Sequence, residues 1–200
     1  MLDHETVLLL IGFQNDYFSK DGILHGVFED PAAVEKVIDN TCQLIETIKE
    51  TNLRVVETPI KFTEDYTELD NPIGILKMIK DSGAFKQNSY GSATIDKIAK
   101  LPVKIESLAG KRGLNCFSNT SIHELLQQYN IKNVLIAGAV TSLCLDTAGR
   151  EALDLGYNVT MLSDCILART KFEQQYYLEE IMPLYSTVQS SQQVIANLTR

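Results

Sequence analysis

Cys144 is the residue whose type and position give this 200-residue sequence its clearest chemical potential. It follows the apolar run Asn133 to Ala137 and stands three residues after Thr141, a residue type that often caps the start of a helix. Thr141 is therefore predicted to be an N-cap, which places Cys144 in the first helical turn, where unpaired N–H groups point outward. There the helix dipole lowers the pKa of a thiol, and the N–H groups stabilise the oxyanion that forms when a thiolate attacks a carbonyl. The alternative is a small, buried apolar cysteine.

Lys111 is the second candidate. It lies in the segment AGKRG, just past the apolar run Val103 to Glu106, where the flanking glycines keep backbone bulk low around a cation. Its ammonium group would support a nearby thiolate or carboxylate; the alternative is a solvated lysine in a turn. Cys42 falls on the apolar stripe of a predicted helix and Cys165 follows a predicted strand, so we interpret both as packed apolar residues.

Metal, nucleic-acid and membrane functions find little support in the composition. The four cysteines form no C-x-x-C pair and the three histidines have no short ligand spacing, so neither a metal site nor a cofactor is predicted. The net charge of -8, from 18 basic and 26 acidic residues, argues against nucleic acid or an anionic membrane as a partner. The apolar run Val7 to Ile11 is too short for a signal peptide or a membrane span, so we expect a soluble, cytoplasmic protein.

Short apolar runs alternate with longer segments of helical period along the whole chain. Near-continuous apolarity is typical of strands buried on both faces, and the alternation predicts a three-layer α/β fold, one domain over residues 1–200 with a six-stranded, mostly parallel sheet. The predicted strands are Val7 to Ile11, Arg54 to Glu57, Val103 to Glu106, Asn133 to Ala137, Asn158 to Leu162 and Ser186 to Val188. The predicted helices are Ala32 to Glu50, Ile73 to Lys80, Ser121 to Tyr129, Leu143 to Leu155, Lys171 to Ile181 and Ser191 to Leu198.

Ligands of such sheets bind at the carboxyl ends of the strands, so the segments that follow the strands are the candidate site. These segments include Gly12 to Asp16, Thr58-Pro59, the AGKRG turn and Gly138 to Cys144. Pro59 to Pro102 is one long irregular section, and long loops inside compact domains tend to be functional. We expect this section to determine substrate identity.

Three stretches of the sequence resemble the isochorismatase-like cysteine hydrolases, which include nicotinamidases, carbamoyl-group amidases and isochorismatase itself. The stretches are LLLIGFQNDYF, GKRGLNCFSNTSIHELL and GAVTSLCLDTAGREALDLGYNVTMLSDC, and the similarity covers nearly the whole chain. TPIKFTEDYTEL and the glycine after Tyr90 are similar to one branch of the family.

The resemblance implies a site in which an Asp, a Lys and a Cys converge at the carboxyl edge of the sheet. The Asp takes the thiol proton, the Lys stabilises the charged pair, and the Cys forms a covalent intermediate. Lys111 and Cys144 match two of these positions. A cis peptide bond is expected between Val140 and Thr141, which would let the amides of Thr141 and Cys144 form the oxyanion hole.

The third position, which the family fills with an acid, is Gly12 in this sequence. A general base contributes about 10²- to 10⁴-fold in rate, so its loss bears directly on activity. Asp16 is the nearest substitute acid in sequence, although a structural role in a turn suits it better. Glu57 and Asp146 are further acids near strand ends without a supporting pattern, and a water molecule beside Gly12 is another substitute.

Two branches of the family fit this sequence poorly. Nicotinamidases have an Asp-x-His metal pair after the second strand, which is absent from Thr58-Pro59-Ile60-Lys61. Isochorismatase proper acts on a vinyl ether without the cysteine. The resemblance therefore favours hydrolysis of an amide or carbamoyl C–N bond in a small molecule; the alternative is an impaired or inactive member that binds a small molecule or serves in an assembly.

Such proteins commonly form homodimers or larger homo-oligomers, so we expect the same here. Phe172, Tyr176, Tyr177 and Tyr185 are candidates for an interface. Their helical spacing fits core positions better.

Overall fold

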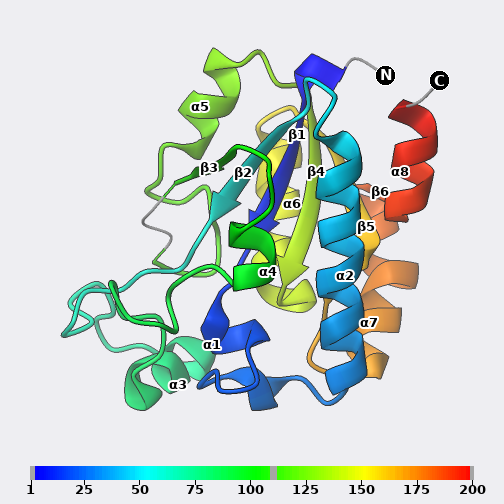
Figure 1. Cartoon of the computed structure of the whole chain (residues 1–200). Coiled ribbons are helices and arrows are strands. Elements are labelled where there is room, and N and C mark those ends of the chain that lie inside the picture. The colour runs from blue at the N-terminus through cyan, green and yellow to red at the C-terminus, as the bar shows by residue number, and fades with distance from the viewer. Residues whose placement is uncertain (1–2, 109–111, 199–200) are drawn as a thin grey trace.

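Six parallel strands form the centre of the protein, in the spatial order β3-β2-β1-β4-β5-β6 (Figure 1). The computed structural model describes residues 3–108 and 112–198. The strands are β1 (Thr6–Ile11), β2 (Arg54–Thr58), β3 (Ile105–Ser107), β4 (Asn133–Ala139), β5 (Asn158–Leu167) and β6 (Thr187–Gln189). The predicted six-stranded α/β fold is confirmed, and each predicted strand overlaps an observed one.

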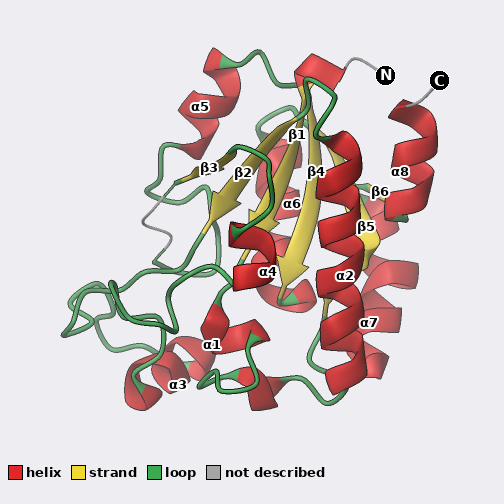
Figure 2. Ribbon diagram, in the orientation of Figure 1, coloured by secondary structure: helices red, strands yellow, loops and turns green. Residues whose placement is uncertain are grey.

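Helices cover both faces of this sheet, as Figure 2 shows. The α-helices are α1 (Asn15–Phe18), α2 (Pro31–Ile48), α3 (Gly74–Ser82), α4 (Asp96–Ala99), α5 (Ile122–Gln128), α6 (Asp146–Asp154), α7 (Lys171–Tyr176) and α8 (Ser191–Leu198). Single 3-10 turns lie at Asp3–Glu5, His25–Val27 and Met182–Leu184. Throughout residues 3–108 and 112–198, every helix is too short or too polar to cross a membrane.

The central strand β1 is completely buried because its two faces support two separate cores. Leu8 and Leu10 pack in the cluster that contains the apolar face of α2, whereas Val7, Leu9 and Ile11 pack with residues of α5 and α6. Successive side chains of β1 point alternately into the two cores, and both cores are apolar. This explains why the sequence of β1 is a continuous apolar run.

Two of the predicted helices are only partly α-helical. The predicted helix Leu143 to Leu155 begins inside a π-helical segment, Thr141–Leu145, and becomes α6 at Asp146. The predicted helix Lys171 to Ile181 is α7 followed by a second π-helical segment, Tyr177–Ile181. Wide turns of this kind recur at functional sites, and the first one contains Cys144.

β4 and β1 approach each other closely at their carboxyl ends. Gly138 pairs with Ile11, and its φ of +133° is a conformation that favours glycine. A Cβ atom on Gly138 would overlap the carbonyl oxygen of Ile11. The register between β4 and β5 also shifts between Ile136 and Gly138. This close approach brings Gly12, the residue after β1, beside Ala139, the last residue of β4.

The buried side chain of Gln14 fastens the long irregular section to the end of β1. Its Nε2 donates to the carbonyl oxygens of Ile60 (2.7 Å) and Ser92 (2.8 Å), and its Oε1 accepts from the amide of Ile60 (2.6 Å). Backbone bonds from Asn15 to Ala93 and from Asp16 to Gly91 continue the attachment. The section that we expect to determine substrate identity is thereby held at the carboxyl edge of the sheet.

The four aromatic residues that we considered for an interface differ in burial. Our interpretation that their spacing fits core positions better was wrong for two of them. Phe172 is 79% exposed and Tyr176 is 46% exposed, and their rings stack with centroids 6.0 Å apart. Tyr177 and Tyr185 are partly buried against the core that contains α6.

Candidate active site

Cys144 lies in the π-helical segment Thr141–Leu145 that follows β4, and its residue is only 2% exposed. The carbonyl oxygen of Val140 accepts from the amides of Leu143 (3.1 Å) and Leu145 (3.3 Å), which closes the turn around Cys144. The thiol therefore lies at the carboxyl edge of the sheet, on a segment whose backbone is fixed by its own hydrogen bonds.

Two expectations about this segment were wrong. Thr141 is not an N-cap, because its hydroxyl donates to Oε1 of Gln174 at 3.0 Å, and Val140 is the residue that precedes the turn. The cis peptide bond joins Ala139 to Val140, one residue earlier than the expected bond between Val140 and Thr141. The side chain of Thr141 is thus bound to α7 rather than to the start of its own helix.

Lys111, the expected cation of the site, lies outside the described residues. Its neighbour Arg112 forms an ion pair with Glu68, with Nη1 3.1 Å from Oε1. The carboxylate of Glu68 also accepts hydrogen bonds from Thr63. Burial opposes ionisation of Glu68, but these hydrogen bonds and the charge of Arg112 lower its pKa below the usual value. The chain after β3 is therefore attached to the long irregular section.

Gly12 is placed beside the end of β4 with a backbone that favours glycine. Its φ is +74°, and a Cβ atom built on it would lie 3.0 Å from the carbonyl oxygen of Ala139. The same Cβ would contact the ring of Tyr17 at 3.7–3.8 Å. The space at this position is therefore narrow, bounded by a strand end on one side and an aromatic ring on the other.

Tyr17 is a residue of this site that we did not single out in the sequence. Its ring packs against Phe28 and Phe85. Burial, together with electrostatic repulsion from Cys144 and Asp16, raises the pKa of the Tyr17 phenol well above its usual value, so it remains protonated. Its place in GFQNDYF, directly after the first strand, was the only available signal in the sequence.

The three acids that could substitute for one at Gly12 all have other partners. Asp16 is buried, with Oδ2 accepting from the amide of Phe85 (2.6 Å) and Oδ1 from the amide of Ile23 (3.3 Å). Glu57 accepts from the hydroxyl of Thr94. Asp146 pairs with Arg150 and accepts from the phenol of Tyr185. These contacts fit structural roles for the three carboxylates.

The other cysteines lie in different surroundings. Burial raises the pKa of Cys42 above its usual value and raises that of Cys165 to about 12. Cys116 is buried in the core next to α5. Within residues 3–108 and 112–198, no three His, Cys, Asp or Glu side chains lie together in a group that could hold a metal ion.

Comparison with known proteins places this geometry in context. A model of the isochorismatase domain matches residues 6–193. Ureidoacrylate amidohydrolase RutB from Stutzerimonas stutzeri (strain A1501) is 24% identical over 199 residues, which cover 93% of this chain and 79% of that protein.

Solved structures of hydrolases are among those with the same fold. The cysteine hydrolase from Pseudomonas syringae pv. phaseolicola 1448A has a TM-score of 0.85 at 16% identity, and the match covers 100% of this chain and 94% of that chain. N-carbamoylsarcosine amidase from Thermoplasma acidophilum has a TM-score of 0.71 at 20% identity, with 94% and 96% covered. At these identities the similarity shows a shared fold.

Proposed function

Because the chain belongs to the isochorismatase family, we propose that it hydrolyses an amide or carbamoyl C–N bond of a small molecule, with Cys144 as the nucleophile. The position of Cys144 carries this proposal: a buried thiol in the π-helical segment that follows a central strand. Similarity to ureidoacrylate amidohydrolase and to N-carbamoylsarcosine amidase favours an N-carbamoyl or related amide as the substrate class.

The proposed reaction has two halves. The Cys144 thiolate attacks the carbonyl carbon and the C=O electron pair moves to oxygen; the C–N bond then breaks, and the nitrogen leaves with a proton as ammonia or an amine. Water attacks the resulting thioester and gives up a proton to solvent, the C–S bond breaks with its electron pair going to sulfur, and the acid product leaves as the Cys144 thiolate is regenerated. We assign the oxyanion to the amides of Thr141 and Cys144, as the family resemblance implies.

Proton transfer is the step in which this chain departs from the family pattern. We propose that a water molecule beside Gly12 takes the thiol proton and delivers it to the leaving nitrogen. Lys111 would stabilise the thiolate electrostatically, as the family resemblance implies. The three nearby acids are engaged elsewhere, which favours water over Asp16 in this role.

A screen of primary amides and N-carbamoyl amino acids tests the proposal, with release of ammonia as the readout. We expect turnover by the parent protein, loss of turnover in Cys144→Ser, and full turnover in the control Cys42→Ser. Mass spectrometry of acid-quenched reactions should find the acyl group on the peptide that contains Cys144. Turnover that survives Cys144→Ser would refute the assignment of the nucleophile.

The second candidate function is binding without turnover, and the geometry at Gly12 favours it. The position has a positive φ and a carbonyl oxygen close to any added Cβ. Binding of N-carbamoyl compounds, measured by calorimetry, with no ammonia release from any compound in the panel would support this reading over hydrolysis.

A further inference from the structure

Gln174 on α7 links the segment that contains Cys144 to the end of β5. Its Oε1 accepts from the hydroxyl of Thr141 (3.0 Å) and from the amide of Ala168 (2.8 Å), and its Nε2 donates to the carbonyl oxygen of Ile166 (3.1 Å). Thr141 is fully buried, so its hydroxyl depends on this one protein acceptor in place of water. One amide side chain therefore connects three parts of the fold.

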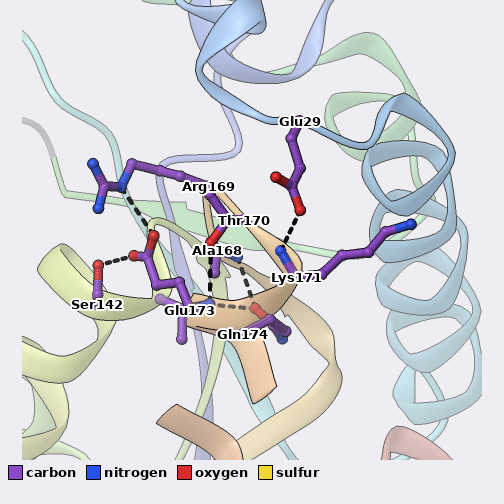
Figure 3. A network of polar contacts seen from close by, with 9 residues as sticks. Glu29, Ser142, Ala168, Arg169, Thr170, Lys171, Glu173 and Gln174 are labelled. Carbon is purple, nitrogen blue, oxygen red and sulfur yellow. Dashed lines mark hydrogen bonds and ion pairs between the residues drawn. The ribbon is translucent and has the colours of Figure 1, made fainter. Parts of the chain in front are cut away.

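Glu173, the preceding residue, makes a parallel link to Ser142 (Figure 3). Its Oε1 accepts from the hydroxyl of Ser142, and its Oε2 accepts from Nε of Arg169 at 3.0 Å. The amide of Glu173 donates to the hydroxyl of Thr170, the N-cap of α7, which fixes the first turn of that helix. The carboxylate is nearly buried, with Glu173 8% exposed, and its charge is matched by Arg169.

Two consecutive residues of α7 thus bind two consecutive residues of the turn that contains Cys144. Packing alone would not hold Gln174 in place, because its residue lines a cavity of about 440 Å³ between α2, the end of β5 and α7. Open space on one side leaves the hydrogen bonds to determine where the amide group lies. The two links therefore connect the side chains of Thr141 and Ser142 to one position along α7.

We infer that Glu173 and Gln174 are positioning residues, which act through Thr141 and Ser142 to hold Cys144 and the adjacent backbone amides in the geometry needed for attack. The inference rests on the proposed function, since it concerns the same nucleophile. Misplacement of a reacting group by about 1 Å costs on the order of 10²-fold in rate. Loss of the links should therefore lower kcat with little change in KM, because the oxyanion contacts strengthen in the transition state.

The principal test compares Gln174→Leu with Gln175→Leu. The second variant removes the side-chain amide of Gln175, the next residue of α7. Gln175 is exposed, and within the part of the chain that the structure describes its side-chain amide donates only to the carboxylate of Glu179. We expect kcat to fall about 10- to 100-fold in Gln174→Leu at unchanged KM, and to stay at the parent value in Gln175→Leu. Equal kcat values in the two folded variants would overturn the inference.

A second readout needs no substrate. Alkylation by iodoacetamide, followed peptide by peptide, should become about tenfold faster at Cys144 in Gln174→Leu, because the turn opens more often. Cys116, which is buried in the core next to α5, should react at its parent rate. Faster alkylation at both thiols, or at neither, would show that Gln174 has only a general structural role and would overturn the inference.

Thr141 provides the check if Gln174→Leu fails to fold. Thr141→Ser keeps the hydroxyl that donates to Gln174, and Thr141→Val removes it. We expect Thr141→Ser to keep most of the parent kcat and Thr141→Val to have a much lower kcat. Faster alkylation of Cys144 alone should occur only in Thr141→Val. Equal behaviour of the two would overturn the inference. Selective exposure of Cys144 without hydrolysis of any amide by the parent would instead refute the proposed function and leave the positioning role standing.

Discussion

A Cβ atom on Gly12 would lie 3.0 Å from the carbonyl oxygen of Ala139, a tighter contact than side chains normally make. Gly138, one residue before Ala139, has no room for a side chain either, because of Ile11. The ends of β1 and β4 thus approach each other at two glycines, one just after β1 and one in β4. At the position where the family resemblance implies an acid, this backbone suits a residue without a side chain.

Gly12→Asp should therefore lower stability while supplying a carboxylate. A left-handed backbone costs a residue with a side chain about 1–2 kcal/mol, although Asp tolerates it better than most. Unfolding in urea should show a loss of this size. Gly12→Ala is the matched control, because it adds the Cβ atom without the carboxylate.

Activity separates the two variants further. If Gly12 is a vacant base position, ammonia release should rise in Gly12→Asp and not in Gly12→Ala. If the glycine belongs to a working site, both variants should be slower than the parent. Equal stability of the parent and both variants would contradict the contact with Ala139.

Asp16→Ala should destabilise the protein by about 1–3 kcal/mol, because it leaves the buried amide of Phe85 without its acceptor. Gly91 lies against the same carboxylate, so the substitution also leaves a void there. Urea denaturation measures the loss, and Asp21→Ala, at an exposed position, is the control. Turnover per folded molecule should stay within about tenfold of the parent value; a drop of the 10²- to 10⁴-fold size of a lost general base would instead mark Asp16 as that base.

The central strands of the fold were predictable from sequence, because a strand buried on both faces is almost continuously apolar. β1 illustrates this, with Val7 to Ile11 all apolar and buried. Helix ends were less predictable. Thr141 has the residue type of an N-cap, but its acceptor, Gln174, is 33 residues away in sequence, and no local pattern reports such a contact.

The candidate site was predictable where local sequence determines it and missed where distant segments meet. Cys144 follows a strand, and that alone placed it at the carboxyl edge of the sheet. Tyr17 was missed because its electrostatic interaction with Cys144 joins two segments that are far apart in sequence. Phe172 and Tyr176 have the spacing of core residues, yet they lie on an exposed side of α7, since burial depends on what packs against a helix.

Gly138→Ala should prevent folding or cost well over 2 kcal/mol, because its Cβ would overlap the backbone of Ile11 in the paired strand. Gly156→Ala is the control: its φ of +90° is also positive, but no atom lies within 4 Å of the added Cβ. The control should lose only about 1–2 kcal/mol. Thermal and urea unfolding measure both values, and equal losses would mean that the close approach of β1 and β4 adds nothing to the cost.

Tyr66→Phe should remove a hydrogen bond whose contribution to stability depends on pH. The phenol of Tyr66 donates to the carbonyl oxygen of Ala84 at 2.5 Å, a buried bond that contributes about 0.5–1.5 kcal/mol. Burial, with the negative charges of Asp16 and Glu64, raises the pKa of Tyr66 from 10.0 to about 12. The unfolded chain therefore loses the phenol proton at lower pH than the folded protein does.

The direction of the pH dependence follows from this difference in proton binding. Above pH 10 the unfolded chain ionises first, so the contribution of Tyr66 to stability is complete below pH 10 and is lost as the pH rises toward 12. In urea titrations, the parent should exceed Tyr66→Phe by a constant margin between about pH 7 and pH 9, and this margin should shrink above pH 10. Tyr90→Phe, at a residue 64% exposed, is the control and should differ little from the parent below pH 10. A margin that stays constant through pH 11 would show that the pKa of Tyr66 is the same in the folded and unfolded states.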